Sequence, residues 1–157
     1  MKASSKIPPL NYDDYYNSAI SRFREATYLY SQPQFSNEYH VLITFLCIVT
    51  VECILTAYLL KNAHENGDPE PDLITTHTFK AYRNLLESSK LLKSDPQPRS
   101  VYIITNYWWN DLRYLDNEAF QKRLENRKLP ENTLIATKNM YGATERIMRA
   151  GVKLWKK

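Results

Sequence analysis

An apolar run of twenty residues, Val41 to Leu60, carries a single carboxylate, Glu52, just past its midpoint. As a helix rising about 1.5 Å per residue, such a run spans roughly 30 Å, which is enough to cross a membrane. A helix that is apolar on all sides can equally form the centre of an all-α core. The length of the run therefore leaves two structures open.

Glu52 and the residues around the run favour the core. A charged side chain at mid-bilayer costs about 2.5 to 3.5 kcal/mol on insertion scales. No Lys/Arg cluster beside the run would set a membrane orientation, and the polar first 35 residues predict no signal peptide. We predict a buried helix and no membrane contact, and the alternative is a small membrane protein anchored by residues 41–60.

The remainder of the chain also predicts helices. It has only three glycines, several long stretches without proline and few alternating β-branched residues. We expect an all-α fold, an antiparallel helical bundle of about five helices in one domain over residues 11–157, preceded by a flexible arm over residues 1–10. The five main helices expected run from Asn11 to about Ser31, from Ser36 to about Gly67, from Thr75 or Thr76 to the Asp95–Pro98 linker, from Arg99 to about Leu112, and from Pro130 almost to the C-terminus. Residues 113–128 are expected to form a long loop with a short helix from Glu118 to about Arg127.

The cysteines and glycines limit the chemistry. Cys47 and Cys53 are six residues apart on one predicted helix, about 9 Å between backbones, so they cannot form a disulfide. Reduced, buried cysteines are typical of a cytoplasmic protein. The three glycines stand alone, so a glycine-rich phosphate loop is excluded and we expect no cofactor. The acidic residues around Gly67 lack the spacing of a metal-binding loop, so we predict no metal site.

Charge is divided unevenly along the chain. Residues 1–78 carry five Lys/Arg and nine Asp/Glu, a balance of −4, whereas residues 79–157 carry sixteen and eight, a balance of +8. The last predicted helix concentrates this charge, because it has an apolar arc on one side and a basic stripe on the other. The stripe either contacts an acidic partner such as RNA or DNA or serves only as a solvated surface. It consists of Arg146, Arg149, Lys153 and Lys156.

Two further groups of residues are candidates for a pocket or an interface. Tyr107, Trp108 and Trp109 are adjacent, so they cannot all point into the core from one helix. At least one ring should lie at a surface, where it either stacks on a base or contacts a partner. Glu52 needs a partner if it is buried, and Arg113 or Tyr107 are the candidates.

Several short motifs resemble those of HEPN domains, the higher eukaryote and prokaryote nucleotide-binding helical bundles. The segment Glu52–Lys61 is similar to the family's E-x-x-L-K-A-x-L element, and His77 lies in a segment that resembles its H-D-L helix start. Arg113 and Tyr114 resemble the Arg-Tyr dipeptide that follows the fourth segment. The resemblance spans about residues 12–155. It departs from the family at Thr56, where lysine is common, and at Thr78, where aspartate is common.

The resemblance implies a function as well as a fold. Ribonuclease members carry an arginine followed four to six residues later by a histidine, but His40, His64 and His77 have no arginine at that distance upstream. We therefore expect no catalytic residues and a non-catalytic interaction module, either a homodimer or a subunit of a larger complex. The system that the family suggests is bacterial defence or toxin–antitoxin. The alternative is a HEPN-type ribonuclease or nucleotide-modifying toxin with an atypical site. The pocket or interface residues that we expect are Glu52, His77, Tyr107, Trp108, Trp109, Arg113 and Tyr114.

Overall fold

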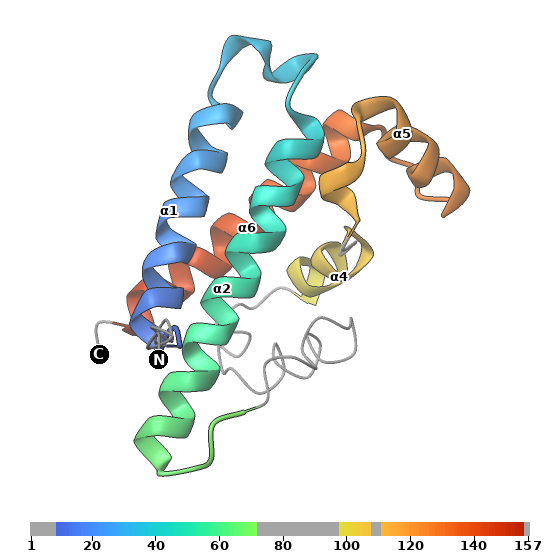
Figure 1. The fold of residues 1–157 in the computed structure, drawn as a ribbon. Helices are drawn as coiled ribbons and strands as arrows, with labels where there is room; N and C mark the ends of the chain where they lie inside the picture. The colour runs from blue at the N-terminus through green and yellow to red at the C-terminus, as the bar shows by residue number, and fades with distance from the viewer. Residues whose placement is uncertain (1–8, 72–97, 108–110, 156–157) are drawn as a thin grey trace, which may run out of the picture.

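The computed structural model describes residues 9–71, 98–107 and 111–155, and each regular element among them is a helix. This confirms the all-α prediction. Helices α1 (Tyr12–Tyr30) and α2 (His40–Asn66) form an antiparallel hairpin, and α6 (Thr133–Trp155) packs across both and ends beside the start of α1 (Figure 1). The expected helix that begins at Thr75 or Thr76 and most of the expected arm lie outside the described residues, so the number of helices stays a prediction.

Local sequence signals explain the ends of α1. The Asn11 side chain accepts a hydrogen bond from the Asp14 backbone nitrogen at 3.0 Å, and the Asp14 carboxylate accepts one from the Asn11 nitrogen at 2.8 Å. This reciprocal pair satisfies two backbone donors that the first turn otherwise leaves free. Ser31 follows the last helical residue, and Pro33 starts the short 3-10 helix Pro33–Ser36 that turns the chain. The predicted limits of α1 are therefore confirmed.

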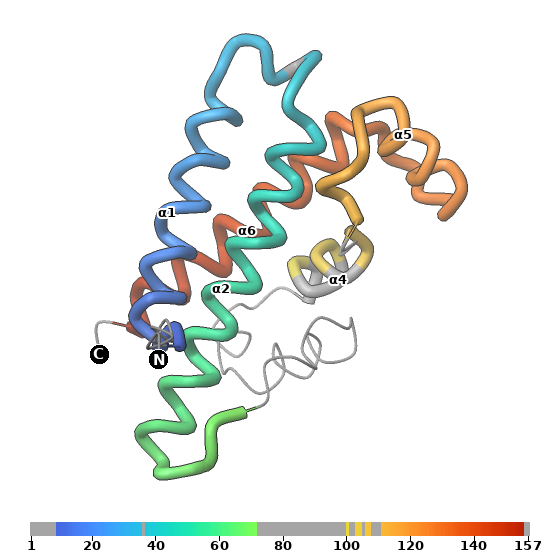
Figure 2. Tube along the Cα trace, viewed as in Figure 1, coloured from blue at the N-terminus to red at the C-terminus, as the bar shows by residue number. Residues whose placement is uncertain are grey.

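Helix α2 starts later than predicted. Ser36 ends the 3-10 helix, and α2 begins only at His40, after Tyr39 adopts a left-handed conformation with φ of 68°. The His40 Nε2 donates to the Phe35 carbonyl at 2.8 Å, and its Nδ1 lies 2.7 Å from the Thr133 hydroxyl of α6. These contacts hold the tight connection between α1 and α2, which Figure 2 shows as a short turn of the chain. They replace the serine cap that the sequence suggested.

The other end of α2 agrees with the prediction. Gly67 has a φ of 69°, a left-handed conformation that glycine adopts without the steric cost of a Cβ. Its nitrogen donates to the His64 carbonyl at 3.3 Å, and the Asp68 nitrogen donates to the Ala63 carbonyl at 2.9 Å. These bonds satisfy carbonyls of the last turn and stop the helix at Asn66.

The core lies around α2. Most of its side chains between His40 and Ala63 are buried, and α1 and α6 both pack against it. Among the described residues, α2 is the one helix that is long and apolar enough to cross a membrane, and 67% of its most apolar window is buried inside the protein. Cys47 is fully buried and Cys53 partly so, and both are free thiols.

Helix α6 runs parallel to α2. The hydrogen-bonded pairs between the two helices, Thr44 with Thr137 and Tyr58 with Gly151, are each 93 residues apart, as parallel helices in register require. The prediction of an antiparallel bundle is therefore wrong for this pair, although it holds for α1 against α2. The reason is the long connection from residue 67 to residue 132, which returns the chain to the end where α2 begins.

Helices α2 and α6 approach closely at Gly151. A Cβ placed there would lie 2.9 Å from Cγ1 of Ile54, so only a glycine fits without displacing a neighbour. The Tyr58 hydroxyl donates to the Gly151 carbonyl at the same level. Burial raises the pKa of Tyr58 to about 12, so this donor keeps its proton through the physiological range.

The segment between α2 and α6 includes a helix over Pro98–Tyr107, labelled α4, a 3-10 turn over Leu112–Tyr114 and helix α5 over Asn117–Asn126. The first confirms the expected helix of this aromatic segment over the described residues 98–107. Asp116 caps α5 by accepting from the Ala119 nitrogen at 2.8 Å. Pro130 precedes α6 instead of occupying its first turn, because Asn132 caps that helix by accepting from the Ile135 nitrogen at 2.9 Å.

Candidate functional site

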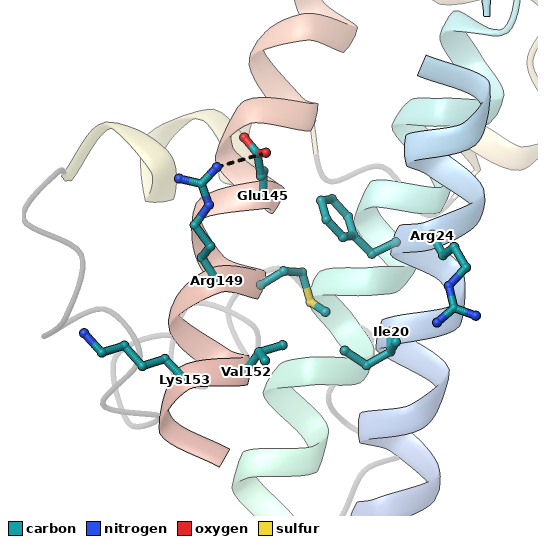
Figure 3. Close-up of a pocket in the computed structure, with 8 residues that line it drawn as sticks. Ile20, Arg24, Glu145, Arg149, Val152 and Lys153 are labelled. Atoms are coloured by element: carbon teal, nitrogen blue, oxygen red, sulfur yellow. Dashed lines mark hydrogen bonds and ion pairs between the residues drawn. The ribbon is translucent and has the colours of Figure 1, made fainter. Parts of the chain in front are cut away.

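The basic stripe of α6 is exposed over its described residues. Arg146, Arg149 and Lys153 have exposed side chains, whereas Lys156 lies outside the described residues. Arg146 donates to the Ser100 hydroxyl at 3.2 Å and therefore points toward α4. Arg149 and Lys153 line the edge of a groove between α1 and α6, and their side chains extend from α6 away from α1 (Figure 3). The sequence placed Arg146, Arg149 and Lys153 on one face of the last helix, and that face is exposed in the structure.

A groove opens between α1 and α6 beside Arg149 and Lys153 (Figure 3). It has a volume of about 490 Å³. Its floor is apolar and comes from Ile20 and Phe23 of α1 and from Met148 and Val152 of α6. Its rim is charged and consists of Arg24, Glu145, Arg149 and Lys153.

Aromatic stacks bound the groove along the seam between α1 and α6. On one side, the ring of Tyr141 stacks on Tyr30 at 3.9 Å and on Phe23 at 5.6 Å. On the other, Trp155 stacks on Tyr16 at 4.3 Å. These ring pairs set the separation of the two helices, and the smaller side chains between them leave the floor open. The shape of the groove is therefore a consequence of where the large rings lie.

The charge around the groove is predominantly positive. Arg149 pairs with Glu145 at 3.2 Å within α6, as Figure 3 shows. Arg24 and Lys153 form no ion pair with any residue in the described part of the chain. Since three cations and one anion line the rim, the groove attracts acidic groups.

Arg24 is the site residue that sequence reasoning missed. It lies next to Phe23 on α1, and no motif of the sequence marks it as a site residue. No local signal connects Arg24 with Lys153, because the two come together only when α1 and α6 pack on α2. The apolar arc of α6 was the nearest available indication that this side of the helix meets another element.

Arg113 and Tyr114 lie at a second hollow, near the start of α2. The Arg113 guanidinium lies 4.9 Å from the centre of the Tyr114 ring, and that ring is 76% exposed. Arg113 also lines a hollow of about 350 Å³. Its other lining residues are Tyr39, Val41, Leu42, Phe45, Leu115 and Asn117. The two residues that resemble the HEPN dipeptide are thus exposed at a surface, as an interface role requires.

The remaining predicted site residues lie elsewhere. Tyr107 is 2% exposed and belongs to the core, so its ring has no free face for a base. Trp108, Trp109 and His77 lie outside the described residues. The candidates that the structure describes are therefore divided between the surface and the core.

Glu52 is partly buried on α2 and acts electrostatically on Tyr15 of α1 and on the adjacent Cys53. Burial, with a smaller contribution from the Glu52 carboxylate, raises the pKa of Cys53 to about 11. The pKa of Tyr15 is also raised, mainly by burial and then by Cys53 and Glu52. Arg113 contacts the first turns of α2, and Glu52 lies seven residues beyond Phe45, roughly 10 Å further along the axis. Arg113 is therefore not the partner of Glu52.

The nucleophilic and basic side chains of the described residues have structural contacts. His40 is buried and holds α2 to Phe35 and Thr133, and the His64 ring lies 5.6 Å from that of Tyr12. Burial raises the pKa of Cys47 to about 12, which keeps its thiol protonated. In the described ranges, no three His, Cys, Asp or Glu side chains converge in a way that would hold a metal ion.

Comparison of the chain with protein-family models, with curated proteins and with solved structures gives no match. The resemblance to HEPN domains therefore depends on the sequence motifs alone.

Proposed function

We propose that the protein is a non-catalytic, HEPN-like interaction module that binds an acidic partner at the α1/α6 groove. The observation that carries this proposal is the rim of the groove, where Arg24, Arg149 and Lys153 outnumber the single Glu145. Exposed cations that surround an apolar floor combine electrostatic attraction with a surface that a partner can desolvate. The module would act as a homodimer or as a subunit of a larger complex, as in defence or toxin–antitoxin systems.

The contacts of the reactive side chains support a binding role over catalysis. A general base or nucleophile needs a free, reachable atom, and His40 uses both ring nitrogens to connect backbone and side chain within the fold. Cys47 is fully buried. The exposed residues of the groove supply positive charge and apolar area, which are properties of an interface.

Salt-dependent binding tests this proposal. We would measure the affinity of the full chain for labelled polyuridine RNA and for labelled polyglutamate across a range of sodium chloride concentrations. A polyanion displaces counterions when it meets Arg and Lys, so the logarithm of the affinity should fall linearly with the logarithm of the salt concentration. The variant Arg149→Glu/Lys153→Glu should bind both probes at least about fivefold more weakly, because it replaces two exposed positive charges of the rim with negative charges.

Lys138→Glu is the matched control. Lys138 is exposed on the same helix, and it lies fifteen residues from Lys153, about 22 Å along the axis. The control should change affinity much less than the double variant. Absence of binding to either probe at low salt would contradict the proposal, as would an equal loss in the control. Cleavage of the RNA would instead favour the ribonuclease alternative.

A further inference from the structure

We propose that the groove binds an acidic amphipathic helix of a partner protein. This inference rests on the proposed function and specifies the chemistry of the partner. It starts from the floor, which is formed by aliphatic and thioether side chains, with Phe23 as the one aromatic residue among the described residues that line it. Such a floor is complementary to leucine-like side chains and not to phosphates or sugars.

The orientation of Phe23 argues against a single-stranded nucleic acid. Binding of that kind uses aromatic faces on which successive bases stack. The Phe23 ring is stacked on Tyr141 at 5.6 Å with 20° between the ring planes, so a neighbouring ring covers one of its faces. The rest of the floor supplies no rings. The groove therefore has the cations that a nucleic acid needs but lacks the stacking surface.

The length of the groove fits a helix. The residues of α6 that line it run from Glu145 to Lys153, eight residues apart, which is about 12 Å along the axis. Two turns of a partner helix span this distance and present an apolar stripe of three side chains, at positions i, i+3 or i+4 and i+7. The walls come from α1 and α6, two helices, so a third helix can lie between them.

The charges select an acidic partner. Arg149 and Lys153 are four residues apart along one wall, and Arg24 lies on the other. Glutamates that flank the apolar stripe of the partner would meet a cation on both sides. Lys153 and Arg24 are free of ion pairs within the described part of the chain, so they would gain a partner without breaking an existing pair. A basic helix would be repelled from the same rim.

The test uses fluorescein-labelled peptides of about fourteen residues and the full protein. The first peptide has leucines on one helical face and glutamates elsewhere. The second has the same composition in an order that disperses the leucines, and the third replaces each glutamate with lysine. Fluorescence anisotropy should show binding of the first peptide and, relative to it, at least about fivefold weaker binding of the other two.

Two variants assign this binding to the groove. Val152→Ser removes apolar area from the floor and Lys153→Glu reverses charge at the rim, and each should weaken binding of the first peptide by about fivefold. Ile135→Ser is the control for Val152→Ser, because Ile135 is 41% exposed on the same helix and lies outside the groove. Lys153 is exposed, so its variant should keep the wild-type circular dichroism spectrum.

The outcomes separate this inference from the proposed function. Equal binding of the ordered and dispersed acidic peptides, or no effect of Val152→Ser, would overturn the helix proposal. If RNA or polyglutamate still bound through Arg149 and Lys153, the acidic-partner function would stand without it. If no acidic probe bound, both would fail. Preferential binding of the ordered acidic peptide, lost in both groove variants, would support both.

Discussion

At the residue scale, Gly151 shows how a single missing Cβ determines how closely two helices pack. A Cβ on Gly151 would lie 2.9 Å from Ile54 Cγ1, whereas a Cβ on Gly142 of the same helix would meet nothing within 4 Å. We expect Gly151→Ala to lower the free energy of unfolding by about 1 to 3 kcal/mol through overpacking. Gly142→Ala should raise it by about 0.5 to 1 kcal/mol through helix propensity. Urea unfolding of both variants measures the difference, and equal effects would show that α2 and α6 are not closely packed at Gly151.

Cys47 makes a second prediction at this scale. Burial raises the pKa of its thiol from 9.0 to about 12, so between these pH values the unfolded chain loses a proton that the folded protein keeps. Its contribution to stability is therefore complete below pH 9 and is lost as the pH rises toward 12. Cys47→Ala should reduce the decline in unfolding free energy between pH 9 and 11, by up to about 1.4 kcal/mol per pH unit.

A matched variant separates titration from packing at Cys47. Val51→Ala also removes a fully buried side chain from α2 but leaves no titratable group altered. Both variants should be less stable than wild type at pH 7, because each creates a cavity. Only Cys47→Ala should show the flatter pH dependence. An unchanged slope in that variant would mean that the thiol is not buried in the folded protein.

At the element scale, the cap of α1 makes a testable contribution. Asn11 and Asp14 exchange hydrogen bonds at 3.0 and 2.8 Å, and the side chain of Asn17 is exposed in the helix interior. Asn11→Ala should lower the free energy of unfolding by about 1 kcal/mol. Asn17→Ala should leave it unchanged or raise it by about 0.5 kcal/mol, since alanine is the better helix former. Thermal unfolding of the two variants tests this, and a loss of similar size in both would exclude capping as the cause.

The ends of the helices were predictable where nearby residues determine them. Asn11 caps the start of α1 and Gly67 the end of α2, through hydrogen bonds between residues three to five positions apart, so the sequence placed both ends correctly. The start of α2 depends instead on His40, whose contact with Thr133 spans 93 residues. A nearby serine therefore gave the wrong boundary. The parallel packing of α2 on α6 was missed for the same reason, because the direction of α6 depends on the long connection before it.

At the scale of the whole molecule, the groove could not be predicted, because it belongs to no single segment. The sequence indicated the apolar arc and the cations of α6, which supply one wall with Arg149 and Lys153. The other wall depends on α1 and α6 being held apart by ring stacks such as Tyr16 with Trp155. Amphipathicity predicts that a face is covered but does not identify the element that covers it. Arg24 entered the site only through that packing.

The burial of α2 also determines whether the protein can associate with a membrane. The residues buried on α2 include Ile43, Cys47 and Ile54, and α1 and α6 cover them. A helix packed in this way presents too little apolar surface to lipid, and Glu52 would remain within the bilayer at a cost of about 2.5 to 3.5 kcal/mol. We expect the protein to purify without detergent and to stay at the bottom of a density gradient when mixed with neutral lipid vesicles. Flotation with the vesicles would show that α2 leaves the bundle to insert, and Val51→Lys distinguishes the two states. In the bundle, Val51→Lys places a charge at a fully buried position and should unfold the protein. If α2 instead inserts into lipid, the same substitution should abolish flotation.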